Sequence, residues 1–421
     1  MFSILSSCLD NGLKVLLRRV PGQRTVSCGV WVNQGGKNET VKDNGISHLV
    51  EHLMFKIKSK NSLTSMTKSI EDLNFIGSKY NAVTTKDYTG YYIDGLSRDI
   101  TKMLEVLSYM VTNKESVEVD DLEKEKQIVL REVEGYLTYS KQIGERVGQA
   151  LWGECSFGQL VIGNPETIKN ISKEMVDSLI KKAYVPENCV LVIVGGFEFG
   201  KIEKDINQLF GNWEDKVNGT RGPIIQKGKG IYINDSYGGN RSTVGIGFST
   251  YPCTDIRSKY CEILKDVLVR PGSRLFNELR EKRGLVYSLS GFSAAFTLVG
   301  NMGLTFTANN DKIQEIVKIY MEELRYLKEN GVDETTIRNI KKIKETELLY
   351  SIESTSSQLK AIGKSAIRGS LFLLEDEIRE LNKVNKENLA EIINEVISAD
   401  NLGLAVLGTV SVDDMLPVLE V

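Results

Sequence analysis

Histidine is nearly missing from this chain, since it occurs only at positions 48 and 52. This scarcity excludes a metal site built from three imidazoles, and it confines any histidine chemistry to one place. Charge of one sign is also missing, because 53 Lys and Arg residues face 56 Asp and Glu residues. The balance argues against nucleic acid or an anionic membrane surface as a partner.

Long apolar runs and closely spaced cysteines are missing as well. No stretch approaches the roughly 20 apolar residues that span a bilayer, so no membrane association is expected. The six cysteines are scattered without a C-x-x-C pair, which fits free thiols packed as small apolar groups. We therefore expect a reducing compartment, the cytoplasm.

A repeat is present instead. Residues 171–195 and 384–408 align without a gap at an offset of 213 residues, and both segments predict a helix, a short turn and a buried strand that ends in glycine. Because twice 213 is close to the chain length of 421 residues, we expect an internal duplication. The expected domains are residues 1–215 and 231–421, joined by a linker at 216–230.

The expected fold class is α+β, with each domain a mainly antiparallel sheet packed with helices. Strands are predicted at residues 25–32, 80–93, 231–233, 243–248 and 285–307. Long helical patterns are predicted at residues 97–111, 120–139, 312–328 and 333–367.

The two histidines stand in the run H-L-V-E-H, with Glu51 between them. A spacing of four residues turns both imidazoles to one face of a helix, where one metal ion could bind. The run is the H-x-x-E-H pattern, the reverse of the H-E-x-x-H zinc signature. The alternative is an ordinary histidine pair on the solvent side of an amphipathic helix.

A catalytic zinc ion usually takes three protein ligands, so a third one must come from Asp, Glu or Cys. The helix at 120–139 offers Glu125 and Glu132, which are seven residues apart and share one face. The alternative for this helix is a solvated face of mixed charge. No histidine occurs near residues 261–268, where the repeat would place a second copy of the histidine helix. Only the first domain can therefore hold this site.

The chain resembles the pitrilysin or insulinase type of inverted-zincin metallopeptidase, in particular its short-subunit branch, which includes mitochondrial processing peptidase and bacterial relatives. Five motifs carry the resemblance in order: G-I-S-H-L-V-E-H-L-M-F-K at 45–56, Y-N-A-V-T-T-K-D-Y-T-G-Y-Y at 80–92, E-K-Q-I-V-L-R-E at 125–132, S-R-L-F at 273–276 and L-R-E-K-R-G-L-V-Y at 279–287. The resemblance spans nearly the whole chain.

The resemblance implies a zinc endopeptidase with one Zn²⁺ per chain. It implies that His48, His52 and Glu132 are the metal ligands and that Glu51 is the base that acts on the zinc-bound water. It implies a supporting role outside the ligand shell for Glu125.

The resemblance also implies substrate contacts. Asn81, Ala82 and Val83 would lend the backbone of an edge strand to an extended peptide, whereas Tyr88, Tyr91 and Tyr92 are expected in the core. Arg280 and Tyr287 would bind substrate and the developing oxyanion. This chain departs from the family pattern at Ile57 and Ile76, where small residues are usual, and this puts substrate preference in doubt.

Two functions remain at this point. The first is an endopeptidase that hydrolyses flexible peptides, or leader and presequence segments, inside a clamshell chamber formed by a homodimer; a heterodimer with a related subunit is the variant. The second is a non-catalytic scaffold or peptide-binding subunit. The physiological substrate is not encoded in these motifs.

Overall fold

The computed structural model describes residues 3–56, 66–113, 117–137, 140–154, 156–214 and 230–411, together with 222, 223, 225, 227, 228, 413 and 415–419. The chain forms two compact units. The first comprises Met1–Val133, Val161–Pro223 and Leu348–Glu375, and the second comprises Glu134–Leu160, Ile224–Glu347 and Asp376–Val421. Within the described residues, no helix combines the length and the apolar composition that crossing a membrane requires.

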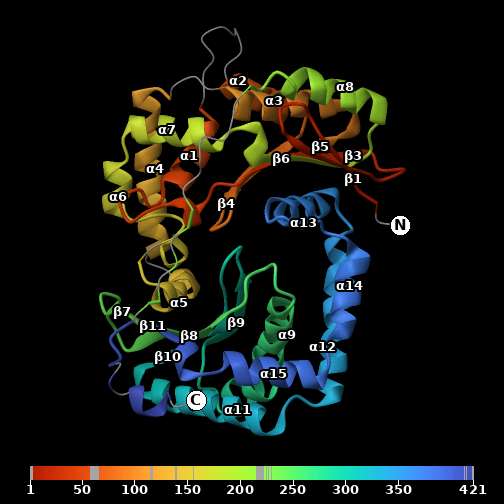
Figure 1. The fold of residues 1–421 in the computed structure, drawn as a ribbon. Helices are drawn as coiled ribbons and strands as arrows, with labels where there is room; N and C mark the ends of the chain where they lie inside the picture. Colours follow the sequence, from red (N-terminus) through yellow and green to blue (C-terminus); the bar gives the residue numbers. More distant parts are fainter. Residues whose placement is uncertain are drawn as a thin grey trace. The chain divides into compact units, whose positions relative to one another are not determined.

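The first unit contains a six-stranded sheet in the order β1-β2-β6-β3-β5-β4, in which only β2 and β6 pair in parallel (Figure 1). Its strands are β1 (Leu5–Cys8), β2 (Lys14–Arg19), β3 (Thr25–Val32), β4 (Lys79–Thr84), β5 (Thr89–Leu96) and β6 (Cys189–Gly195). Its helices are α1 (Ile46–Met54), α2 (Met66–Phe75), α3 (Ile100–Thr112), most of α4 (Val119–Leu137), α6 (Pro165–Asn170), α7 (Lys173–Ala183), α8 (Phe199–Phe210) and α13 (Thr355–Ile367).

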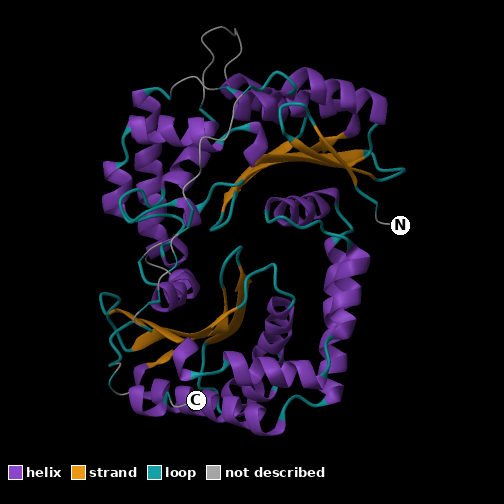
Figure 2. Cartoon of the chain, in the orientation of Figure 1, coloured by secondary structure: helices purple, strands orange, loops and turns teal. Residues whose placement is uncertain are grey.

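The second unit contains a five-stranded sheet in the order β7-β11-β8-β10-β9, in which only β7 and β11 pair in parallel. Its strands are β7 (Ile231–Asn234), β8 (Arg241–Thr250), β9 (Ser288–Ala295), β10 (Gly300–Asn309) and β11 (Leu402–Leu407). Its helices are α5 (Ile143–Trp152), α9 (Arg257–Val269), α10 (Arg274–Phe276), α11 (Ile313–Asn330), most of α12 (Glu334–Ser351), most of α14 (Leu374–Lys383) and α15 (Lys386–Val396). The predicted α+β class with mainly antiparallel sheets is confirmed (Figure 2).

The repeat at an offset of 213 residues is visible in the structure. Helix α7 begins and ends 213 residues before α15, and each is capped by a side chain, Ser172 in one copy and Asn385 in the other. Strand β6 ends at Gly195, and Gly408 directly follows the last residue of β11; the two glycines have φ angles of +136° and +144°. The strand order β2-β6-β3-β5-β4 also has its counterpart in β7-β11-β8-β10-β9.

The two units do not correspond to a single division of the chain between residues 215 and 231, because one helix of each half packs in the unit of the other half. Helix α13, from the second half, covers one face of the first sheet, while α3 lies on the opposite face (Figure 1). Helix α5, from the first half, packs on β8 and β11 in the second unit. These two helices occupy corresponding positions in the repeat, so the exchange is symmetric. The domain limits 1–215 and 231–421 stay a prediction for the repeats themselves.

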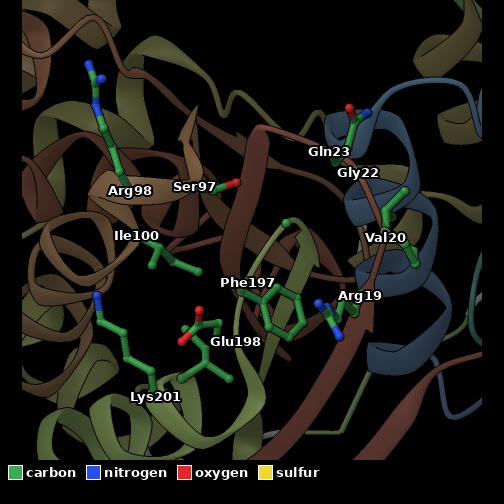
Figure 3. A pocket seen from close by; sticks show the side chains of 13 residues that line it. Arg19, Val20, Gly22, Gln23, Ser97, Arg98, Ile100, Phe197, Glu198 and Lys201 are labelled. Atoms are coloured by element: carbon green, nitrogen blue, oxygen red, sulfur yellow. The ribbon is translucent and has the colours of Figure 1, made fainter.

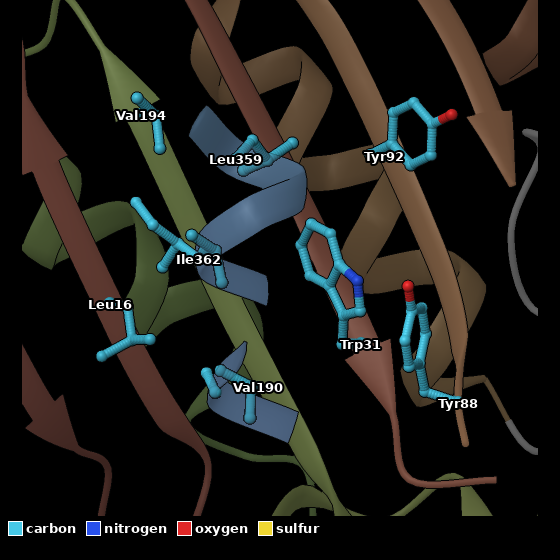
Figure 4. Packing of buried hydrophobic residues seen from close by; sticks show 10 residues of the cluster. Leu16, Trp31, Tyr88, Tyr92, Val190, Val194, Leu359 and Ile362 are labelled. Carbon is cyan, nitrogen blue, oxygen red and sulfur yellow. The ribbon is translucent and has the colours of Figure 1, made fainter. Parts of the chain in front are cut away.

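The contact between α13 and the first sheet is apolar. Leu359 and Ile362 are fully buried against Trp31, Val190 and neighbouring strand residues (Figure 4). Burying a side chain of this kind contributes about 1.5–3 kcal/mol relative to leaving it exposed. Gly363 lets the helix lie directly on the indole, because a Cβ added there would come within 2.3 Å of Trp31 Cε2.

The prediction of a single long helix at residues 333–367 was wrong. The structure divides it into α12 and α13, with the break at residues 352–354. The physical reason is Ser354, which adopts an extended conformation and accepts a hydrogen bond from the backbone N–H of Ser357, so it starts a new helix. The strand expected at 25–32 matches β3.

The Trp31 contact provides a stability test. Gly363→Ala forces a methyl group into the indole and should lower the free energy of unfolding by about 1–3 kcal/mol, which outweighs the gain in helix propensity. Gly144→Ala in α5 is the matched control, because the added Cβ meets no described atom within 4 Å apart from its chain neighbours and the backbone of its own helix. Denaturant unfolding of both variants measures the difference, and equal stability would contradict this account of the packing.

Candidate metal centre

Helix α1 carries both histidines, and its start is held by a buried carboxylate. Glu39 Oε2 accepts from the backbone N–H of Gly45 at 2.8 Å, and Oε1 accepts from that of Ser47 at 2.8 Å. These are N–H groups that a helix leaves without partners at its first turn. The negative charge also lies at the positive end of the helix dipole. Glu39 therefore acts in place of an N-cap side chain for α1.

The surroundings of Glu39 and Gly45 make this start rigid. Glu39 is only 2% exposed. Burial raises the pKa of Glu39, while hydrogen bonds from Gly45, Ser47 and Asn44 act in the opposite direction. Gly45 has φ +90°, and a Cβ there would come within 2.8 Å of Gly163 Cα. Only glycine fits this position without strain.

The metal-ligating atoms converge from α1 and α4. His48 Nε2 lies 3.7 Å from Glu132 Oε2, and His52 Nε2 lies 3.5 Å from the same oxygen. Four-coordinate zinc with bonds near 2.1 Å places its ligand atoms about 3.4 Å apart. Among the described residues, these three form the one cluster of at least three His, Cys, Asp or Glu side chains suited to a metal ion. The donor set and the spacing both fit zinc.

The protonation of His48 also suits a metal ligand. Burial, with a smaller contribution from His52, lowers the pKa of His48 to about 3. The imidazole is therefore neutral near pH 7, which is the form that binds metal. Its Nδ1 is buried and has no hydrogen-bond partner among the described residues, whereas its Nε2 lies near Glu132.

Glu125 lies one layer behind the ligands. It is 4% exposed, and its Oε2 lies 3.3 Å from His52 Nδ1. A carboxylate in this place makes Nδ1 the protonated nitrogen of His52 and leaves Nε2 for the metal. Lys56 Nζ lies 3.5 Å from Glu125 Oε1 and balances its charge. Glu125 and Glu132 thus reach the two histidines from one face of α4.

Glu51 points to the same region from α1. The hydroxyl of Thr84, the last residue of β4, donates a hydrogen bond to Glu51 Oε2. Burial raises the pKa of Glu51, and the hydrogen bonds from Thr84 and the charge of His52 counteract part of that effect. The chain therefore places a half-buried acid with one hydrogen-bonded oxygen next to the candidate ligands.

The candidate substrate residues lie on β4, an edge strand that pairs with β5. Asn81 and Val83 are exposed, and Ala82 is half-buried. The Asn81 side chain accepts from the backbone N–H of Ala82 at 2.9 Å. Tyr88, Tyr91 and Tyr92 are at most 8% exposed, as expected for core residues.

Arg280 and Tyr287 belong to the second unit and are described within it. Arg280 is exposed in the π-helical segment Asn277–Lys282, with its guanidinium 5.6 Å from the centre of the Phe276 ring. Tyr287 is 54% exposed, and Arg241 both stacks on its ring and donates to its hydroxyl at 2.9 Å. Their roles stay predictions.

Ile76 is half-buried in the turn before β4, and Ile57 lies outside the described residues, so their effect on substrate preference stays a prediction. Sequence reasoning missed Glu39 and Thr84, because no spacing rule links them to the histidines. A separate cavity of about 400 Å³ in the first unit is lined by residues such as Arg19, Phe197 and Lys201 and by none of the metal cluster (Figure 3).

Two family models match the chain. The one described as insulinase (peptidase family M16) matches residues 14–160, and the one described as the peptidase M16 inactive domain matches residues 170–344. The first match contains the complete metal cluster. The second contains no histidine, and the single site stays a prediction.

The chain is similar to proteins with related names over nearly its whole length. It is 28% identical to the uncharacterized zinc protease YmxG of Bacillus subtilis, covering 93% of this chain and 95% of that protein. It is 22% identical to the mitochondrial-processing peptidase subunit beta of Saccharomyces cerevisiae, covering 96% and 91%. The crystal structure of a protease from Helicobacter pylori has the same fold, with a TM-score of 0.89, 19% identity and coverage of 97% and 100%.

The contact between Glu125 and His52 gives a prediction about metal affinity. Glu125→Gln should weaken zinc binding about 10- to 100-fold, because a neutral amide orients the imidazole less strongly and is less able to raise its basicity. Competition with a chromogenic chelator measures the change. Glu134→Gln, an exposed acid on the same helix, is the control and should bind zinc normally; equal affinities for the two variants would remove Glu125 from the site.

Proposed function

Because the chain belongs to the insulinase family (peptidase family M16), we propose that it is a zinc-dependent endopeptidase that hydrolyses flexible peptides or leader segments. The observation that carries the proposal is the convergence of His48, His52 and Glu132, with Glu51 beside them. The names of its relatives as zinc proteases agree with this chemistry.

Each residue of the site has its own proposed role in catalysis. His48, His52 and Glu132 would hold one zinc ion. When bound, zinc supplies a Lewis acid that polarises a substrate carbonyl and activates a water molecule. Glu51 takes the proton from the attacking water and delivers it to the leaving amine. Glu125 keeps His52 in the required tautomer.

Substrate binding would use the edge of the first sheet. We infer that Asn81, Ala82 and Val83 pair with an extended peptide through backbone hydrogen bonds, as edge strands do in other peptide-binding domains. Arg280 and Tyr287, from the second unit of the same or another subunit, would stabilise negative charge that develops on the carbonyl oxygen. Flexible peptides are the proposed substrates, because their backbone can become extended without unfolding a packed structure.

The assembly and location are also proposals. A chain that carries the complete metal set together with Arg280 and Tyr287 needs no complementary active subunit, so we propose a homodimer that encloses its substrates. The relative named subunit beta makes a heterodimer the alternative. The free thiols of Cys8, Cys28, Cys189 and Cys261 fit a reducing compartment, and we propose the cytoplasm.

The proposal is tested by Glu51→Gln. This variant should retain one zinc ion per chain, because Glu51 is not a ligand, and should lose at least about 10²-fold in kcat, because the general base is missing. Zinc content is measured by mass spectrometry and turnover by cleavage of a mixed peptide pool.

Metal removal is the companion control for the wild-type protein. Chelation should abolish cleavage, and added zinc should restore it. Activity that survives chelation or Glu51→Gln would refute the endopeptidase. A zinc-containing wild-type protein that binds peptides and cleaves none would instead support the scaffold or peptide-binding alternative. The description of the second family match as an inactive domain keeps this alternative in the test.

The proposed oxyanion role gives a separate prediction. Tyr287→Phe should lower kcat about 10²- to 10³-fold, as expected when one donor to the developing charge is lost, while zinc content stays unchanged. Tyr326→Phe is the matched control, because Tyr326 is also partly exposed and stacked by an arginine, Arg274. Equal kcat values for the two variants would exclude the proposed role of Tyr287.

A further inference from the structure

We propose that Thr84 is a positioning residue that holds Glu51 in its working orientation and ties this orientation to the strand that binds substrate. The inference rests on the proposed endopeptidase function. It starts from one contact, the hydrogen bond that the Thr84 hydroxyl donates to Glu51 Oε2. This contact joins the end of β4 to the middle of α1.

The contact fixes the orientation of the Glu51 carboxylate. A glutamate side chain has several rotatable bonds, so its carboxylate needs a fixed partner to keep one position. The hydroxyl donates to Oε2, and the backbone of Thr84 also donates to this carboxylate. Without the hydroxyl, only the backbone bond from Thr84 would remain, and the carboxylate would be held in one orientation less firmly.

Thr84 is itself held firmly. Its side chain is β-branched, which restricts its own rotamers, and its backbone pairs with Thr89 across the hairpin. Thr89 is fully buried and donates to the carbonyl of Gln34 at 2.9 Å. The hydroxyl that orients Glu51 is therefore attached to a rigid strand end.

The turn after Thr84 adds to this rigidity. The Thr85 hydroxyl donates to the carbonyl of Tyr88 at 3.0 Å and accepts from the backbone N–H of Asp87 at 3.2 Å. The buried carboxylate of Asp87 forms an ion pair with Arg368, just after α13, at 2.7 Å. The segment that contains α13 and Arg368 thus helps to hold the β4–β5 hairpin, which carries Thr84.

The position of Thr84 in the strand gives the contact its functional meaning. Thr84 directly follows Asn81, Ala82 and Val83, the proposed substrate residues. A peptide that pairs with β4 takes its register from this strand, and the same strand holds the base. We infer that β4 aligns the scissile bond and Glu51 together.

A purely structural role for Thr84 makes a different prediction. If its hydroxyl only stabilised the hairpin, its loss would lower stability or substrate affinity and leave kcat nearly unchanged. If it positions Glu51, its loss lowers kcat while KM and zinc content stay close to the wild-type values.

The experiment compares Thr84→Val with Thr84→Ser in the full-length protein, using a fluorogenic peptide from the pool that the wild type cleaves. Thr84→Val keeps the shape of the side chain and loses the hydroxyl, so kcat should fall about 10- to 100-fold, a part of the general-base contribution. Thr84→Ser keeps the hydroxyl and should retain most of kcat. If Thr84→Val does not yield folded protein, Thr84→Ala replaces it under the same criteria.

The matched control is Thr101→Val. The Thr101 hydroxyl also donates to a carboxylate, Asp205 Oδ2, at 2.7 Å, and it lies between α3 and α8. This variant removes the same kind of bond and should leave kcat unchanged. Thr84→Val combined with Glu51→Gln should be no slower than Glu51→Gln alone, because the two residues act as a unit.

The outcomes separate this inference from the proposed function. Full activity of Glu51→Gln would refute the endopeptidase itself. An inactive Glu51→Gln together with a Thr84→Val kcat within twofold of wild type would overturn only the role of Thr84. Equal losses in Thr84→Val and Thr84→Ser would also overturn it, because the hydroxyl would then not be the cause.

Discussion

The arrangement of the candidate site depends on the hydrogen bonds that the buried carboxylate of Glu39 accepts. This carboxylate binds the first turn of α1, and His48, Glu51 and His52 all follow on this one helix. At the other end, Glu125 holds His52 Nδ1. A short helix with both ends fixed cannot rotate about its axis, and both imidazoles therefore face Glu132.

Two acids on α4 serve different purposes because of their surroundings. Glu132 is 44% exposed at its side chain and reaches both imidazoles through Oε2, as a ligand must. Glu125 is buried and lies beside Lys56, so it can hold a tautomer without competing for the metal. Seven residues of helix, two turns, separate the roles.

The two units share a frame, whereas the candidate metal cluster occurs, among the described residues, in the first unit alone. Helices α7 and α15 share their caps and limits, and the sheets share their strand order. Each half also donates one helix, α5 or α13, to the sheet of the other. This exchange brings Arg368 to Asp87, so a segment from the second half stabilises the hairpin next to Glu51.

The sequence by itself determined the features that depend on local periodicity. The H-x-x-E-H spacing places both histidines on one face of a helix, the seven-residue spacing does the same for Glu125 and Glu132, and the 213-residue repeat predicts two similar units. Tertiary structure alone decided which atoms meet. Glu39 and Thr84 act across folded loops and strands, where contact depends on chain paths that no local spacing encodes. The exchange of α5 and α13 likewise depends on which apolar sheet face each helix covers, and the hydrophobic effect that drives this burial is non-directional.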